Sequence, residues 1–165
     1  MSTLEQQALS KTWFYPFRLP SGRVTTTYDG GVLDAIHATR LSMLEAALRA
    51  EYGDSIADKT VVDIACHQGW FSTQLAAMGA RDVLAIDARA EHVADATLIR
   101  DALGLSNMRV ARSDVHALTA EALGTFDRAG RLEGHVGGRD PALGAGDALL
   151  HRALADEEGA GDLLD

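Results

Sequence analysis

The fold is decided by the stretch Thr60-Val-Val-Asp-Ile-Ala-Cys-His-Gln-Gly69 and its continuation Trp70-Phe-Ser72. Residues 60–65 are mostly strand formers, and the short turn that follows ends in a glycine. Residues 70–78 then carry apolar side chains at helical spacing. A strand, a tight turn and a helix in this order present backbone N–H groups to a ligand in α/β domains. The stretch therefore predicts an α/β domain with a ligand site after its first strand.

The same pattern repeats along the chain. Residues 82–87 read as a second strand, residues 91–103 as a second helix and residues 108–112 as a third strand. Strands that alternate with helices of this length require right-handed crossovers and a parallel sheet. We therefore expect an incomplete Rossmann-like fold, a parallel sheet with helices on both faces, of which three strands are clear.

An aromatic segment and a long helical pattern precede the first strand. Residues 13–17 read Trp-Phe-Tyr-Pro-Phe, and prolines at 16 and 20 with a following turn disfavour a regular element. This arm packs on the core, or forms a lid over a substrate or cofactor site with Trp13, Tyr15 and Arg18 facing it, and the two roles are compatible. Residues 31–52 predict an amphipathic helix on which His37 is either a packing residue or a substrate contact.

The last part of the chain has a different composition. Residues 128–165 hold eight of the sixteen glycines, a single β-branched residue, Val136, and no aromatic residue. This composition predicts no strand, although residues 147–158 have a short helical pattern. We expect three parts: an arm and helix over 1–58, a Rossmann-like half-domain over 59–127, and a poorly ordered tail over 128–165.

Charge and cysteine content limit the classes of partner and compartment. The net charge of -9 and a pI near 5.0 argue against an extended basic surface for a nucleic-acid backbone. The one cysteine, Cys66, cannot form an internal disulfide, and no apolar stretch is long enough for a membrane span or a signal peptide. We expect a cytoplasmic protein without a membrane partner.

Acidic residues follow the second and third predicted strands. Ligands of open parallel sheets bind beyond the carboxyl ends of the strands, where Asp87 and Asp114 stand. A carboxylate at Asp87 can accept two ribose hydroxyls, and Asp114 can accept a hydrogen bond from the exocyclic amine of adenine. Gly69 lets the backbone approach a ligand, and the amides that begin the next helix favour a carboxylate. Each acid taken alone is equally well explained as a helix cap.

These residues resemble the motifs of the class I S-adenosylmethionine-dependent methyltransferases. Residues 61–69 are similar to the first motif, 83–87 to the second, whose terminal acid holds the ribose, and 112–115 to the third, which flanks the adenine. The arm is more loosely similar to the extension of the branch that includes tRNA wobble-uridine methyltransferases. The resemblance covers residues 13–127 and implies S-adenosylmethionine as cofactor. The cofactor-binding residues that it implies are Asp63, Ala65, Cys66, His67, Gly69, Trp70, Phe71, Asp87, Ala88, Asp114 and Val115.

Two departures from the motif set affect its interpretation. Ala65 and His67 stand where the family has glycine, so the turn is less permissive. Cys66 beside His67 also suggests a metal or nucleophile site, which the lack of partner ligands at useful spacing disfavours. After Phe126 and Asp127 the resemblance stops, in a position where the family carries its fourth strand.

Three functions remain open at this point. The first is an S-adenosylmethionine-dependent methyltransferase, or its cofactor-binding portion, whose acceptor is a small molecule or a tRNA and whose catalytic residues the sequence does not indicate. The second is a non-catalytic, truncated or frame-altered fragment that self-associates through an open sheet edge. The third, an NAD-dependent oxidoreductase, is disfavoured because the turn lacks the G-x-G-x-x-G pattern.

Overall fold

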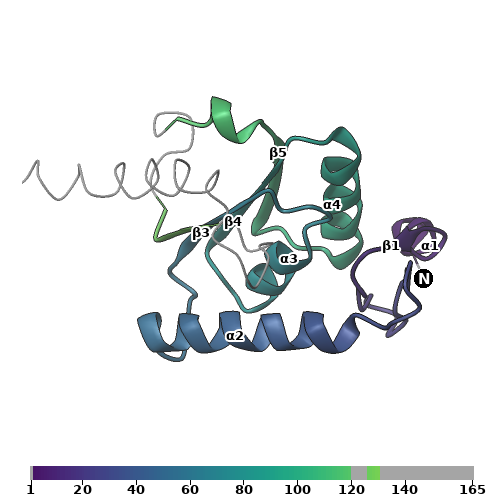
Figure 1. Ribbon diagram of the computed structural model, residues 1–165, viewed down its shortest axis with the longest axis horizontal. Helices are drawn as coiled ribbons and strands as arrows, with labels where there is room; N and C mark the ends of the chain where they lie inside the picture. Colours follow the sequence, from purple (N-terminus) through teal and green to yellow (C-terminus); the bar gives the residue numbers. More distant parts are fainter. Residues whose placement is uncertain (1, 120–125, 131–165) are drawn as a thin grey trace, which may run out of the picture.

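The computed structural model describes residues 2–119 and 126–130, and its centre is a four-stranded parallel sheet (Figure 1). The strands are β3 (Thr60–Ile64), β4 (Asp82–Asp87), β5 (Met108–Arg112) and β6 (Arg128–Gly130). Their spatial order is β5-β4-β3-β6. The chain therefore moves outward from β3 to β5 and then returns to the other side of β3, which confirms the Rossmann-like α/β fold.

Strand β6 corrects the expectation that no strand follows residue 127. It pairs parallel to β3, with Val61 opposite Arg128 and Asp63 opposite Gly130. Directly before it, the Asp127 carboxylate accepts hydrogen bonds from the backbone N–H of Thr60 at 2.7 Å and from its hydroxyl at 2.9 Å. These contacts align the segment with the edge of β3, so tertiary pairing overrides the poor strand propensity of Arg-Ala-Gly. The expectations for residues 131–165 lie outside the described residues.

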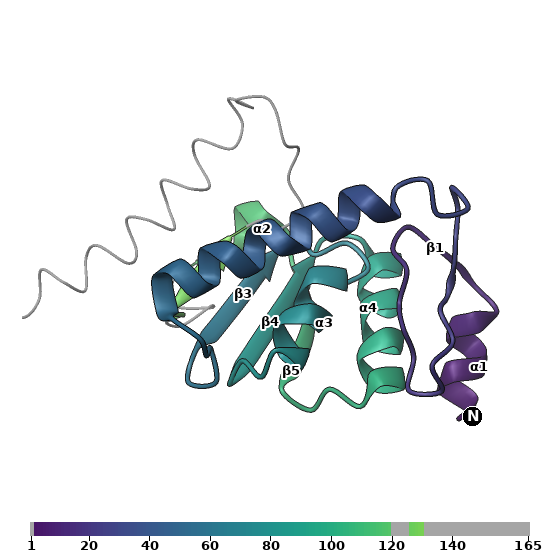
Figure 2. The same ribbon diagram turned by 90° about the horizontal axis from the view of Figure 1, so that it is seen from below.

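Three helices cover one face of this sheet (Figures 1 and 2). They are α2 (Asp34–Tyr52), α3 (Trp70–Ala77) and α4 (Ala90–Leu103). Helices α3 and α4 connect β3 to β4 and β4 to β5, and two right-handed crossovers in the same direction place their helices on the same face. Within the described residues, Leu118, which follows the short helix η1 (Val115–Ala117), and Phe126 pack on the opposite face.

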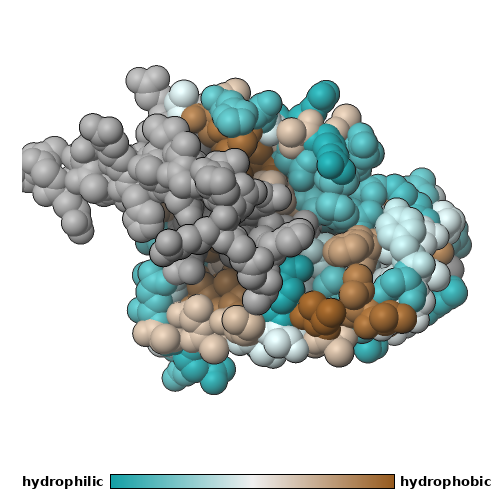
Figure 3. All heavy atoms as spheres, viewed as in Figure 1, coloured by the Kyte–Doolittle hydropathy of each residue, from teal (hydrophilic) through white to brown (hydrophobic). Residues whose placement is uncertain are grey.

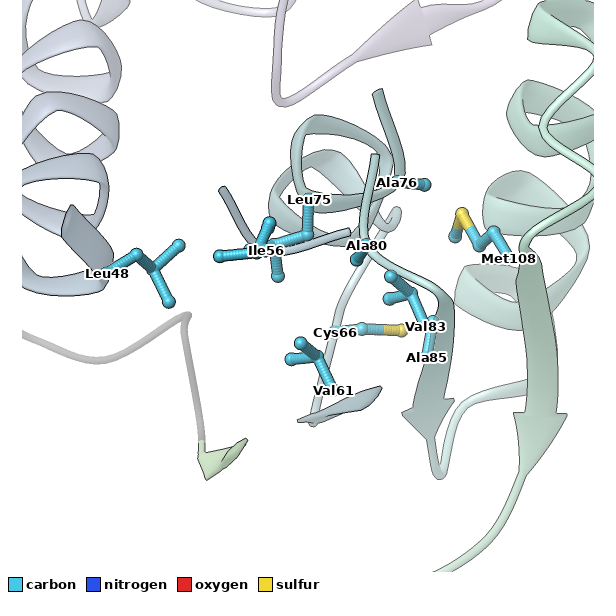
Figure 4. Close-up of a cluster of buried hydrophobic side chains, with 10 residues drawn as sticks. All are labelled: Leu48, Ile56, Val61, Cys66, Leu75, Ala76, Ala80, Val83, Ala85 and Met108. Carbon is cyan, nitrogen blue, oxygen red and sulfur yellow. The ribbon is translucent and has the colours of Figure 1, made fainter. Parts of the chain in front are cut away.

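The sheet is apolar on both faces. Toward the helices, the buried side chains form the cluster drawn in Figure 4: Leu48, Ile56, Val61, Cys66, Leu75, Ala76, Ala80, Val83, Ala85 and Met108. On the other face, a second set consists of Val62, Ile64, Leu84 and Ile86, against which Leu118 and Phe126 pack. Alternate residues of β3 and β4 thus point to opposite faces, as the strand geometry requires, and both sides are buried.

The N-terminal arm is ordered and packs against the helices. It comprises α1 (Thr3–Leu9), β1 (Thr12–Trp13) and β2 (Thr26–Thr27), and the two short strands pair in parallel. Four alternate residues of the arm are at most 2% exposed: Trp13, Tyr15, Phe17 and Leu19. They belong to a cluster that includes Trp70 and Phe71 of α3. The structure therefore shows the arm packed on the core, and its role as a lid over a site stays a prediction.

In Figure 3, apolar atoms gather near the beginning of α2, where Val32 and Ile36 are 78% and 54% exposed. Among the helices of residues 2–119 and 126–130, none combines the length and apolar character that a membrane span requires. The boundaries of the three expected parts, and self-association through a sheet edge, stay predictions.

Candidate functional site

A pocket of about 260 Å³ opens at the carboxyl ends of β3, β4 and β5. This is the edge at which open parallel sheets bind their ligands. The walls come from the end of each strand and from the segment that follows it. They are Ile64, Ala65 and His67 after β3, Ile86, Asp87, Ala88, Arg89 and His92 around the start of α4, and Ser113, Asp114 and Val115 after β5.

Asp87 is the most firmly held of the acidic groups in this pocket. It is the last residue of β4 and only 7% exposed. One carboxylate oxygen accepts the backbone N–H of His67 and the other that of Arg89, both at 2.9 Å. The second oxygen also lies 3.2 Å from Nδ1 of His92. Because an ionised carboxylate has about four acceptor positions, the fixed Asp87 retains capacity for a ligand hydroxyl.

Asp114 stands at the same edge, after β5. Its carboxylate accepts the backbone N–H of His116 at 2.9 Å and caps the short helix η1. The side chain is exposed on the pocket wall. Both roles weighed from the sequence, a cap and a pocket group, are thus present in the same residue.

The turn after β3 places two residues other than glycine in the left-handed region. Ala65 has φ +59° and His67 has φ +53°. A β-carbon in this region costs roughly 1–2 kcal/mol per residue. Ala65 and His67, which stand where the motif has glycine, therefore occupy the positions at which the backbone conformation favours glycine.

We expect Ala65→Gly to leave the free energy of unfolding unchanged or raise it by up to about 1 kcal/mol, since relief of strain outweighs the added unfolded-state entropy. The matched control is Ala94→Gly on the exposed side of α4, which should lower it by about 1 kcal/mol. Urea denaturation of both variants checks this. A loss at Ala65 as large as the loss at Ala94 would contradict the strained turn.

Gly69 also has a positive φ, +77°, but it faces α4 rather than the pocket. A β-carbon there would lie 3.0 Å from Cβ of Ala96 and 3.3 Å from Cε of Met108. The expectation was that this glycine lets the backbone approach a ligand. In the structure it instead allows close packing of the turn against α4 and β5, the third of the glycine roles in such turns.

His67 joins the pocket to the arm. Its ring centroid lies 4.0 Å from that of His92 and 5.5 Å from that of Phe14. Its Nδ1 is buried without a hydrogen-bond partner. Burial, and secondly the neighbouring His92, lower the pKa of His67 to about 4. The imidazole is therefore neutral at pH 7.

This shift predicts a loss of stability in mild acid. The unfolded chain binds a proton at His67 near pH 6.5 and the folded chain only near pH 4, so the unfolded state holds more protons between these values. The contribution of the neutral His67 to the free energy of unfolding is complete above pH 6.5 and declines as the pH falls. We expect the free energy of unfolding to decrease from pH 7 to pH 5, with a smaller slope in His67→Asn. A slope that this substitution does not change would contradict the assignment.

The described residues contain a second histidine whose pKa is lowered. His37 of α2 is 2% exposed, and burial and then the nearby Arg40 lower its pKa. Its ring centroid lies 4.5 Å from that of Tyr15. His37 should therefore leave a residual slope in the His67 variant.

Five of the predicted cofactor residues are not among those that line the pocket: Asp63, Cys66, Gly69, Trp70 and Phe71. Asp63 is fully buried in β3 and accepts a 2.6 Å hydrogen bond from the hydroxyl of Ser72, which ties the strand to α3. Cys66 is buried, and its thiol donates to the His67 carbonyl at 3.6 Å. The other six, Ala65, His67, Asp87, Ala88, Asp114 and Val115, line the pocket together.

The four residues suggested for a substrate are also not part of its walls. Trp13 donates its indole N–H to the Ala8 carbonyl at 2.8 Å, and Tyr15 stacks on Trp70 at 5.2 Å and 9°. Arg18 is exposed and donates to the Gly22 carbonyl at 3.3 Å. His37 lies among the arm aromatics. A substrate role for these residues stays a prediction.

Gln68 fixes the arm to the turn beside the pocket. Its side-chain oxygen accepts the backbone N–H of Phe14 at 2.8 Å, and its side-chain NH₂ donates to Asp95 of α4 at 2.9 Å. Lys11 of the arm forms an ion pair with the same carboxylate. The arm, the turn and α4 thus share one polar network that is largely buried.

The sequence reasoning missed five wall residues: Ile64, Ile86, Arg89, His92 and Ser113. Ile64, Ile86 and Ser113 neighbour predicted positions, and the strand ends could have indicated them. His92 lies on the first turn of α4, five residues after Asp87, and only the direction of that helix brings it back to the pocket. No group of three His, Cys, Asp or Glu side chains that could hold a metal ion occurs in residues 2–119 and 126–130.

The comparisons with known proteins support the fold. Neither a family model nor a curated protein sequence matches the chain. The N-terminal domain of EvdMO1, solved with SAH bound, is similar with a TM-score of 0.59 and 21% identity, over 78% of this chain and 53% of that domain. A longer EvdMO1 structure gives 0.55 and 19%, over 76% of this chain and 27% of its own length.

A weaker similarity is to coclaurine N-methyltransferase bound to N-methylheliamine and SAH. Its TM-score is 0.45 and its identity 22%, over 55% of this chain and 26% of that one, which is too low to carry an argument. The chain thus spans about half the length, or less, of these structures. The comparisons show a methyltransferase-like, Rossmann-type fold, and at these identities they show the fold alone.

Proposed function

We propose that the chain binds S-adenosylmethionine in the pocket at the carboxyl ends of β3, β4 and β5, and serves as a methyltransferase or as its cofactor-binding portion. The observation that carries the proposal is the joint position of Asp87 and Asp114 on the walls of one pocket. Asp87 accepts the ribose hydroxyls and Asp114 the adenine amine. SAH bound to a domain of the same fold supports this ligand class.

The neutral state of His67 is consistent with this cofactor. The sulfonium of S-adenosylmethionine is a cation, and a charged imidazole on the pocket wall would repel it. Because the pKa of His67 is lowered to about 4, the wall presents an uncharged ring at neutral pH. The acidic side chains of the pocket add favourable charge.

A titration of the purified full-length chain with S-adenosylhomocysteine and, separately, with NAD tests the proposal. We expect S-adenosylhomocysteine to bind and NAD to bind much more weakly, because Ala65 and His67 narrow the turn that a pyrophosphate would approach. Binding of NAD alone would favour the oxidoreductase alternative and contradict the proposal.

Catalysis is a further step of the proposal. Methyl transfer needs an aligned acceptor more than a dedicated base, and proximity supplies most of the rate. The chain spans 53% of the EvdMO1 domain, so methyl transfer by this chain alone has to be assayed separately from cofactor binding. We favour a small-molecule acceptor over a tRNA, given the net charge of -9. Release of S-adenosylhomocysteine with candidate acceptors, compared with none, separates an enzyme from a binding module.

A further inference from the structure

His67 lines the pocket, and its ring packs with a second pocket residue and with two residues of the arm. The centroid of the ring lies 4.0 Å from that of His92, 5.5 Å from that of Phe14 and 6.1 Å from that of Tyr15. Its backbone N–H is fixed to Asp87 at 2.9 Å. Ring and backbone are both held, so the imidazole is a fixed part of the wall.

In the segment after β3, Ala65 and His67 line the pocket, whereas Gly69 and Trp70 at the start of α3 do not. The volume of about 260 Å³ lies just below the roughly 300–1,000 Å³ that is usual for pockets of whole small-molecule ligands. This space suits the nucleoside half of an adenosyl ligand. The amino-acid half has to pass His67 to reach the N–H groups at the start of α3, where a carboxylate is stabilised.

We infer that His67 is a specificity-determining residue that restricts tight binding to the nucleoside half of an adenosyl ligand. The inference rests on the proposed function and concerns the same site. Uncharged nucleosides such as adenosine and 5′-methylthioadenosine then bind nearly as tightly as S-adenosylhomocysteine, because the charged amino-acid tail gains few contacts. The family motif has glycine at this position, so this chain differs from its pattern in the residue that bounds the pocket.

The test compares the affinities of adenosine, 5′-methylthioadenosine and S-adenosylhomocysteine for the full chain by isothermal titration calorimetry. For the wild type we expect the three dissociation constants to agree within about threefold. In His67→Gly, which suits the left-handed backbone, S-adenosylhomocysteine should bind at least about tenfold more tightly while adenosine changes by less than about threefold.

His67→Phe is the matched control because it keeps a ring of similar size and removes the nitrogens. It should retain the wild-type affinity ratio, and circular dichroism verifies that both variants fold. Three results would overturn the inference while leaving the proposed function intact: S-adenosylhomocysteine bound about a hundredfold more tightly than adenosine by the wild type, an unchanged ratio in His67→Gly, or a raised ratio in His67→Phe. If no adenosyl ligand binds to the wild type or to His67→Gly, both the inference and the proposed function fail.

Discussion

Replacement of Trp13 by alanine should lower the free energy of unfolding by about 3–5 kcal/mol, the range for a buried large aromatic residue. Trp13 is fully buried, packs edge-on against Phe17 at 5.2 Å and donates its indole N–H to the Ala8 carbonyl. The substitution leaves a cavity and removes the shorter of two hydrogen bonds that the Ala8 carbonyl accepts, the other coming from the Lys11 N–H at 3.4 Å. For a domain whose total stability is commonly 5–15 kcal/mol, this is a severe loss. Urea denaturation followed by far-ultraviolet circular dichroism, which reports backbone structure and does not depend on Trp13 fluorescence, measures this loss.

Arg18→Ala in the same arm provides the control. Arg18 is exposed, so its replacement should change the stability by no more than about 0.5 kcal/mol. A loss below about 1 kcal/mol for Trp13→Ala would mean that the arm is not part of the folded core. That result would favour a lid over a site as the main role of the arm.

Replacement of Asp87 by alanine should weaken the binding of S-adenosylhomocysteine at least about tenfold, since each hydrogen bond to a charged group contributes roughly 1.5–3 kcal/mol. Two effects contribute. The ribose loses its acceptor, and the turn loses the carboxylate that holds the N–H groups of His67 and Arg89. Calorimetric titration at pH 7 measures the change.

Asp82→Ala is the matched control because Asp82 starts the same strand at the opposite end. It pairs with Arg109, which lowers its pKa, and it lies far from the pocket walls along the strand. Its loss should leave the affinity within about twofold. An unchanged affinity in Asp87→Ala would remove Asp87 from the site, and equal losses in both variants would point to general destabilisation.

The sheet was predictable because its strands are short, apolar runs bounded by turn signals. Strand β5, the third one predicted, has the predicted bounds. Strand β3, the first one predicted, ends one residue early because Ala65 adopts a left-handed conformation. Helix α2 begins at Asp34 rather than at residue 31, since Gly30 and Gly31 both have positive φ. The local sequence was therefore enough to predict these elements. The errors in their predicted bounds occur where individual backbone angles end the strand or delay the start of the helix.

Other features depend on contacts that a sequence does not display. Strand β6 forms because Asp127 aligns it with Thr60, across a separation of 67 residues. The arm carries its signal in the alternation of Trp13, Tyr15 and Phe17, which reads as an extended segment with one buried side, but its prolines obscured that pattern. The full set of pocket residues could not be predicted without the direction of α4, because that direction brings His92 close to Asp87.

The most direct test of the central claim is a map of backbone amide chemical-shift changes when S-adenosylhomocysteine is added to the isotope-labelled chain. The account predicts the largest changes at His67, Ala88 and residues 113–115, with small changes in the arm near Trp13. Changes confined to the arm, or none at saturating ligand, would contradict the claim that this pocket binds an adenosyl cofactor.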